Sequence, residues 1–432
     1  MVKLSGVGGL GVLCAVAGML ACMPCAYAQS QNFSWEPEDP PLVGIAQLGT
    51  GVAVNGRTAA VGASLFGPEE NPETPQYDPP WLGLVNVYTT DAARTRWTLL
   101  TVLHLDDFLP ENQEFGKAIA IQGRFLVVAA NASLHIYGRR HHHYELLDTV
   151  VLEDATISES AAMQFERDVL AVSVQDNSGD SSVRVFRISP QGKAREVASI
   201  SPPGDPDLFN VGGVSLDADA RTLAVGMISR SGDALNRVHL YEAHGSRWRR
   251  TDVIMAPGTS ATGFAGSLAI SGNRLVVGAS GENRVLEENS FLWSGAVYVY
   301  AHARHRWARV QRPAADDPAQ PSYALVGFGW EILTDGRFVW ITAPFEHDQN
   351  ASTVQSGPAS LYRWNGRRLE FVTHASSSLP GGGSDMSRRY VIEGDIYGSI
   401  HQLDGAHVVD LSELVRPATE TDDQAETGDA EE

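Results

Sequence analysis

The sequence predicts an all-β protein, a seven-bladed β-propeller built from four-stranded antiparallel blades. The first observation is an internal repeat: seven times, a short apolar run, a tight polar turn and a second apolar run recur in the same order. The clearest copy is residues 263–280 (GFAGSLAISGNRLVVGAS), and residues 295–300 (GAVYVY) follow it after a variable stretch. A repeat with a period of several tens of residues indicates one structural unit that stacks on its neighbours.

The remaining six copies differ in clarity. Four are clear and two are degenerate; in chain order they begin at Gly49, Phe115, Ala161 (degenerate), Gly212, Gly327 and Ser384 (degenerate). Because the repeat runs almost from end to end, we expect one domain rather than two.

The second observation is the turn inside each copy. Leu268 and Ile270 alternate with small or polar residues, Gly272 and Asn273 form a turn, and an apolar run resumes at Leu275. Alternation on both sides of a two-residue turn with a glycine predicts a β-hairpin. The same turn recurs at Asn55-Gly56, Gln122-Gly123 and Asp335-Gly336.

The third observation concerns the rest of each unit. A third strand ends in an aromatic residue, a basic turn follows, and an aromatic residue opens a fourth strand, as in Tyr300 and Trp307. The same pattern occurs at Tyr88 with Trp97, Tyr137 with Tyr144, and Tyr241 with Trp248. Four antiparallel strands make one propeller blade, and seven stacked blades close a ring without a long free edge.

The seventh unit is the weakest. We expect its third strand at residues 400–403 and its fourth at residues 408–411. Residues 44–47 or 32–35 are expected to help close the ring.

The pattern of the first 28 residues predicts an export signal peptide that is cleaved off after Ala28. Lys3 gives a positive start, residues 6–21 are apolar or small, and Ala26-Tyr27-Ala28 fits a small-x-small cleavage site. The alternatives are an uncleaved anchor and a lipid anchor at Cys22. We expect an N-terminal extension at residues 29–44, the propeller at residues 45–416 and an acidic, disordered tail at residues 417–432. The mature protein is expected in the periplasm, on the cell surface or outside the cell.

The composition restricts the partners. All three cysteines lie in the leader, so a chain cut after Ala28 can form no disulfide. The formal net charge of -20 argues against nucleic acid or anionic lipid as a partner, because both attract clustered Lys and Arg. The last thirteen residues hold seven of the acids. Asn32, Asn131 and Asn350 fit the N-glycosylation sequon, whose use depends on the host.

The repeats resemble the FG-GAP repeat of the integrin α-subunit propeller and of secreted bacterial proteins. The FG element stands at Phe115-Gly116 and Phe328-Gly329, with Gly263-Phe264 a near match. The GAP element stands loosely at residues 62–64, 278–280 and 342–344, and a Gly-x-Val-x-Val strand begins at Gly295. The resemblance covers about residues 45–415 and implies a binding propeller.

The resemblance also implies a calcium loop between the first two strands of a blade, with carboxylates at alternate positions. Here these turns are short, and only Asp217 and Asp219 are spaced in this way, with Arg221 where another ligand is wanted. We therefore expect no cofactor, with calcium at Asp217 and Asp219 as the weaker alternative.

Known catalytic motifs are missing from the sequence. No segment has the spacing of a nucleophile elbow, a His-Glu-x-x-His zinc helix or a phosphate loop. His141, His142 and His143 are expected in a solvated turn rather than around a metal, because adjacent strand residues point to opposite faces. The sequence therefore predicts a protein that is not an enzyme.

The candidate ligand-binding site lies on the variable connections between second and third strands. Such loops emerge on one face of a propeller, where a rigid scaffold holds them, and integrin-like propellers bind partners there. Glu282 is also expected on this acidic rim. The candidate residues are Glu69, Glu70, Trp81, Glu287, Glu288, Trp293, Glu346, His347 and Asp348.

The leading functional hypothesis is a secreted or envelope recognition module that binds a protein or glycan on that face. One alternative is a carbohydrate-active hydrolase or lyase that uses carboxylates and His347, because paired carboxylates suit acid–base chemistry. The other is a structural subunit of a cell-envelope assembly. Apart from the leader, the chain has no candidate membrane span.

Overall fold

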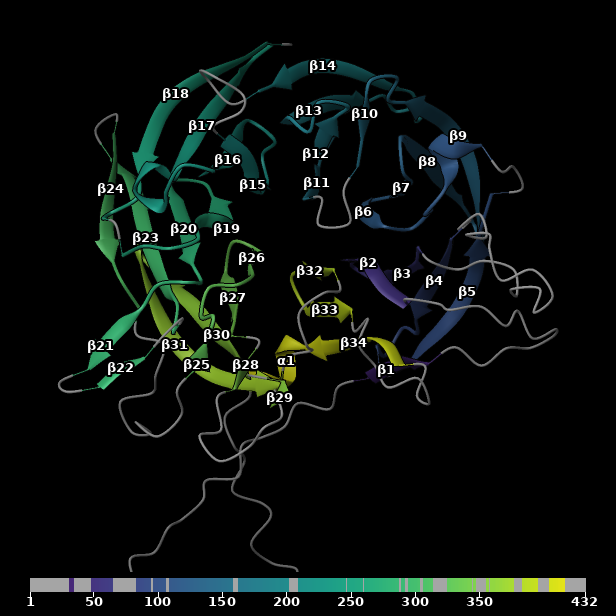
Figure 1. Cartoon of the computed structure of the whole chain (residues 1–432). Coiled ribbons are helices and arrows are strands. Elements are labelled where there is room, and N and C mark those ends of the chain that lie inside the picture. Colours follow the sequence, from purple (N-terminus) through teal and green to yellow (C-terminus); the bar gives the residue numbers. More distant parts are fainter. Residues whose placement is uncertain are drawn as a thin grey trace, which may run out of the picture.

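The computed structural model is a closed ring of seven antiparallel sheets around a central axis (Figure 1). This confirms the predicted seven-bladed β-propeller. No helix among the described residues is long and apolar enough to cross a membrane. The structure describes residues 31–34, 48–64, 83–94, 96–105, 109–157, 162–201, 209–245, 247–258, 260–286, 289–291, 294–303, 306–313, 325–343, 345–346, 355–356, 358–376, 383–394 and 404–415.

The strands of each blade follow the chain from the axis outward, except in blade 7. Blade 1 consists of β2 (Leu48–Asn55), β3 (Thr58–Ala63), β4 (Leu84–Thr90) and β5 (Trp97–Leu103). Blade 2 consists of β6 (Ala118–Gln122), β7 (Phe125–Ala129), β8 (Ser133–Arg140) and β9 (His143–Val151). Blade 3 consists of β11 (Met163–Glu166), β12 (Val169–Asp176), β13 (Ser181–Ile188) and β14 (Ala194–Ile200), with β10 (Ala155–Thr156) also on β12.

The second half of the ring repeats this order. Blade 4 consists of β15 (Phe209–Leu216), β16 (Thr222–Ser229), β17 (Arg237–His244) and β18 (Arg247–Met255). Blade 5 consists of β19 (Phe264–Ser271), β20 (Arg274–Ala279), β23 (Ala296–Ala303) and β24 (Arg306–Gln311). Blade 6 consists of β26 (Ile332–Thr334), β27 (Phe338–Thr342), β30 (Pro358–Asn365) and β31 (Arg368–Ser376).

Blade 7 joins the two ends of the chain. It consists of β32 (Ser384–Met386), β33 (Tyr390–Gly394), β34 (Asp404–Asp410) and β1 (Gln31–Ser34), and β1 pairs antiparallel with β34. The prediction of a fourth strand at residues 408–411 was wrong, because Val408 lies in the third strand and the N-terminal segment supplies the fourth. Of the two segments considered for ring closure, 32–35 overlaps β1, whereas 44–47 lies outside the described residues, as does 400–403.

The hydrophobic core lies between blades rather than within them. The described residues form seven buried clusters, and each cluster combines side chains from two adjacent blades. For example, Val52 and Val61 of blade 1 pack with Tyr390 and Ile392 of blade 7. Both faces of every blade are therefore buried against a neighbour.

The blades approach each other closely at the FG-like residues. Phe115 and Phe328 are fully buried, and the next residues, Gly116 and Gly329, have φ of +98° and +88°. A Cβ on Gly278 of blade 5 would lie 2.1 Å from the Gly329 carbonyl oxygen of blade 6. The same relation holds for Gly62 of blade 1 and Gly116 of blade 2, again at 2.1 Å. Small residues are required at these positions because backbone meets backbone.

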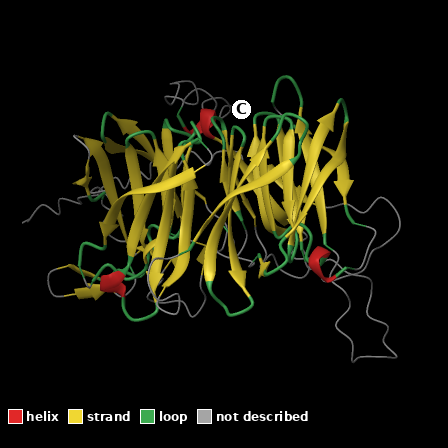
Figure 2. Cartoon of the chain, turned by 90° about the horizontal axis from the view of Figure 1, so that it is seen from above, coloured by secondary structure: helices red, strands yellow, loops and turns green. Residues whose placement is uncertain are grey.

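The antiparallel order places alternate connections on opposite ends of the ring. We call the end with the first-to-second and third-to-fourth strand turns the turn face, and the opposite end the loop face. The short helix α1 (Leu411–Leu414) follows β34 and lies on the turn face. The 3₁₀ turns η1 (Pro110–Asn112) and η3 (Asp233–Leu235) and the hairpin β21 (Arg284–Leu286) to β22 (Asn289–Phe291) lie on the loop face. The red helices in Figure 2 are divided between the two ends accordingly.

Replacing Gly278 with alanine should lower the free energy of unfolding in urea by about 3 kcal/mol, because the new methyl group forces blades 5 and 6 apart. The matched control is Gly258→Ala, where a Cβ meets nothing within 4 Å and the change should stay within about 0.5 kcal/mol. Equal stability of the two variants would contradict the close blade contact.

Candidate functional site

Most of the predicted loop-face residues lie outside the part of the chain that the structure describes. These are Glu69, Glu70, Trp81, Glu287, Glu288, Trp293, His347 and Asp348. The backbone of Glu346 lies in β28 (Phe345–Glu346), which pairs with β25 (Leu325–Val326) and β29 (Gln355–Ser356). The loop-face site therefore stays a prediction.

The sequence predicted Glu282 on an exposed acidic rim, and this prediction was wrong because Glu282 is buried. Its carboxylate is buried, accepts a 2.5 Å hydrogen bond from the Tyr298 hydroxyl and pairs with Arg312 at 2.7 Å. Burial, together with the Glu282 carboxylate, raises the pKa of Tyr298 to about 12. A buried carboxylate needs such partners, so Glu282 anchors the end of the loop against blade 5.

Asp217 and Asp219 use their carboxylate oxygens within the turns. Asp217 Oδ1 accepts from the backbone N–H groups of Ala218 (2.9 Å) and Gly272 (2.8 Å), and Asp219 Oδ1 accepts from Arg221 N–H (2.8 Å). Gly272 belongs to the turn of blade 5, so Asp217 joins the turns of two blades. Among the described residues, no group of three or more His, Cys, Asp or Glu side chains could hold a metal ion.

A channel of about 830 Å³ runs along the axis and opens at the turn face. Its wall is made of the innermost strands and of the turns that follow them, as the propeller fold dictates. Gln122, Gln164, Glu166, Asp335 and Asp385 supply polar groups to this wall. The channel therefore has walls from all seven blades that combine polar and apolar groups.

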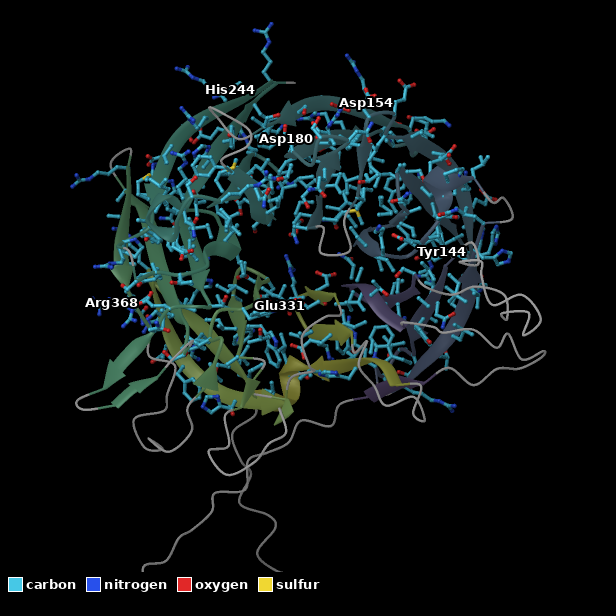
Figure 3. The ribbon with its side chains drawn as sticks, in the orientation of Figure 1. Tyr144, Asp154, Asp180, His244, Glu331 and Arg368 are labelled. Atoms are coloured by element: carbon cyan, nitrogen blue, oxygen red, sulfur yellow. The ribbon has the colours of Figure 1, made fainter. Side chains whose placement is uncertain are left out.

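Three half-buried carboxyl groups of the inner wall have raised pKa values. Burial and the nearby Glu393 raise the pKa of Glu331 to about 7. Burial raises the pKa of Asp385 to about 7, although the backbone N–H groups of Val54 and Met386 donate to it. Burial raises the pKa of Glu166 to about 6. Figure 3 shows Glu331 at the inner wall of the ring and Tyr144, His244 and Arg368 toward its outside.

The mouth of the channel on the turn face is surrounded by arginines. All seven turns between first and second strands carry one, in or directly beside the turn. These residues are Arg57, Arg124, Arg167, Arg221, Arg274, Arg337, Arg388 and, also in blade 7, Arg389. Arg124, Arg167, Arg388 and Arg389 line the channel itself, together with Arg94.

Several of these arginines bond to backbone carbonyls rather than to carboxylates. Arg167 Nε donates to Ala218 of blade 4 at 3.2 Å, and Arg274 donates to Gly336 of blade 6 at 2.9 Å. Arg57 donates to Thr90 within its own blade at 2.6 Å. A carbonyl satisfies donors without neutralising the guanidinium, so positive charge remains at the surface.

The third-to-fourth strand turns extend this basic surface. Each of the six turns in blades 1 to 6 has basic residues in it or directly beside it, and Asp91 is the one acid between the flanking strands. The basic residues include Arg94, Arg96, Arg140, Lys193, Arg247, Arg306, Arg367 and Arg368. His141, His142 and His143 are exposed beside them, as expected for a solvated turn.

Serine and histidine side chains meet in the structure, but not at an accessible place. Ser133 Oγ lies 2.8 Å from His135 Nε2, and both side chains are buried, at 0% and 2% exposure. Ser360 Oγ lies 3.2 Å from His374 Nδ1, and Ser360 is also fully buried. These pairs serve the packing between strands, because no substrate reaches them.

The sequence contained a signal for the arginine surface that the loop-face hypothesis did not use. The turn motifs NGR, QGR and DGR and the third-to-fourth turns are basic in a chain whose net charge is -20. The net charge of the whole chain does not reveal that basic residues are concentrated in the turns. The concentration becomes visible only when the fold brings these turns to one face.

Changing Glu331 to glutamine should stabilise the protein at pH 8, by less at pH 5, and leave it unchanged near pH 4. The folded pKa of about 7 exceeds the unfolded value of about 4.3, so the charged form costs stability above pH 7 and the cost disappears as the pH falls toward 4. The midpoint of thermal unfolding at several pH values measures this. Equal midpoints at pH 8 would contradict the raised pKa.

No protein-family profile matches the chain, and no curated protein sequence does either. Among solved structures, hydrazine synthase from Kuenenia stuttgartiensis aligns with a TM-score of 0.54 at 10% identity, over 87% of this chain and 99% of the other.

The β-propeller domain of Cps50 (Swd1) from Myceliophteria thermophila aligns with a TM-score of 0.51 at 10% identity, over 88% and 99%. A Bacteroides uniformis protein provisionally named a 6-phosphogluconolactonase reaches 0.45 at 12% identity, over 76% and 85%. The alignments with hydrazine synthase and with the Cps50 domain support the fold of this protein, a seven-bladed β-propeller.

Proposed function

We propose that this protein is a recognition module that binds a carboxylate-rich segment of a partner protein across the turn face. The observation that carries the proposal is the arginine at each of the seven turns around the channel mouth. The planar guanidinium pairs with a carboxylate through two parallel hydrogen bonds, which a lysine cannot do. Only three of the 32 basic residues of the chain are lysines.

The distribution of charge supports an acidic rather than a basic partner at this face. The chain as a whole carries a net charge of -20, yet arginines dominate the turns on one end of the ring. The turns also carry the carboxylates of Asp168, Asp217, Asp219 and Asp335, but arginines outnumber them. A face on which positive charge predominates attracts an acidic partner and raises its association rate, with a strong dependence on salt.

We further propose that the chain is a propeller of the FG-GAP type. The support is that the two halves of the motif meet across blade interfaces: Phe115-Gly116 lies against Gly62, and Phe328-Gly329 lies against Gly278. The third match differs, because Ala265 has φ of +71° where the other copies have glycine.

The protein is proposed to have no catalytic activity and no bound cofactor. Support comes from the complete burial of Ser133 and Ser360 beside their histidines. Export is proposed as well, because cleavage after Ala28 would leave β1, which begins at Gln31, available to close the ring.

A second binding face remains a proposal from the sequence alone, namely the long loops with Trp81 and Trp293. Replacing both tryptophans with alanine should abolish binding of a glycan or protein from an array screen at that face. Binding that survives the double replacement, or turnover of a polysaccharide, would contradict a recognition role for these residues.

The turn-face proposal is tested by the double variant Arg124→Glu with Arg388→Glu. Binding of a fluorescent 15-residue polyglutamate, measured by anisotropy at low salt, should weaken at least tenfold because two guanidinium contacts are reversed. The matched control is Arg230→Glu with Arg309→Glu, which makes the same charge change on exposed positions outside the turns, at the loop-face end of β16 and within β24.

Two results would contradict the proposal. One is an equal loss of polyglutamate binding in the control, which would mean that only net charge matters. The other is tight binding of a sulfated polysaccharide with no binding of polyglutamate by any variant.

A further inference from the structure

We propose that the acidic C-terminal segment, residues 417–432, docks on the turn face of its own ring and competes there with the acidic partner. This inference rests on the proposed function, because it uses the same arginines. In this proposal the segment is an intramolecular competitor that lowers the affinity of the turn face for the acidic partner.

The chain leaves the described structure on the turn face, at a fixed point. Asp410 Oδ1 accepts from Ser412 N–H at 2.9 Å, and Asp410 Oδ2 accepts from the Arg389 guanidinium at 2.6 Å. Leu411 is 1% exposed and packs with Phe338 and Val391. Helix α1 is therefore fastened to blades 6 and 7, beside Arg388 and Arg389.

The segment is long enough to cover the channel mouth. Helix α1 follows β34, the third strand of blade 7, and two strand spacings of about 4.8 Å separate that strand from the innermost one. The rim of the mouth thus lies about 10 Å from the end of β34. A chain of n residues reaches at most about 3.3–3.6 Å times n, so the first four residues after Val415 suffice and the acidic residues follow them.

The charges of the segment and the face are complementary. Between residues 417 and 432 there is no lysine or arginine and no large apolar side chain, so contacts to the face would be electrostatic. The acids are Glu420, Asp422, Asp423, Glu426, Asp429, Glu431 and Glu432. Basic groups of blades 6, 7 and 1 on this face include those of Arg337, Arg388 and Arg94.

Because the C-terminal segment is tethered to the ring, it can occupy the turn face even if its intrinsic affinity for that face is weak. A short flexible tether gives a local concentration in the millimolar range, so a segment that binds in isolation with a Kd near 0.1 mM would occupy the face about nine-tenths of the time. An external acidic ligand would then bind about tenfold more weakly than it does to a face without a competitor.

The test compares the full chain with a full-length variant whose tail is neutralised at all seven acids, by Glu→Gln and Asp→Asn substitution. The probe is a fluorescent peptide of residues 418–432, and the readout is its Kd by anisotropy at about 50 mM salt. The neutralised chain should bind the peptide about tenfold more tightly than the unaltered chain. At about 1 M salt, where the screening length is about 3 Å, the difference should vanish.

The outcomes separate the two proposals. Equal and measurable affinity of both chains would overturn the docked tail and leave the binding face intact. Failure of the neutralised chain to bind the peptide would overturn both. Competition that appears only as the concentration of the unaltered chain rises, with dimers in sedimentation, would overturn docking within one ring and indicate exchange of tails between copies.

Discussion

The contact between neighbouring blades is the interaction on which the rest of the structure depends. A single four-stranded blade has two apolar faces, and the seven buried clusters are each shared by two blades, so no blade has a core of its own. Glycines such as Gly62 and Gly278 let the backbones meet. The ring must therefore close, and pairing of β1 with β34 joins the chain ends.

Because the contacts between blades stabilise the fold, recognition residues can be placed in the turns at the ends of the strands. Because stability comes from blade interfaces, the turns at the ends of the strands need only short polar sequences, and they tolerate an arginine at each position. Carbonyl contacts such as Arg167 to Ala218 and Arg274 to Gly336 hold adjacent turns together without neutralising the guanidinium. The same residues thus fix the rim of the channel and leave it positively charged.

Local sequence patterns predicted what depends on local structure. The hairpin turns at Asn55-Gly56 and Gly272-Asn273 were readable, because a two-residue turn needs a particular backbone conformation. The fourth strand of blade 7 was predicted at the wrong place, and ring closure was narrowed only to two segments, of which 32–35 overlaps β1. Its partner lies some 370 positions away in the chain, and no local pattern marks that pairing. The same limit applies to the site: the pKa of Glu331 depends on Glu393 of another blade, and the ring of arginines appears only after seven turns are brought to one face.

Ring closure by the N-terminal strand can be measured directly. Hydrogen exchange of the β34 amides would be compared between the chain that begins at Gln29 and one that begins after Ser34. If the two termini close the ring, removal of β1 should speed exchange along β34 and along the blade 6 and blade 1 strands that pack against blade 7, and should lower the midpoint of thermal unfolding. Unchanged exchange and an unchanged midpoint would contradict the account.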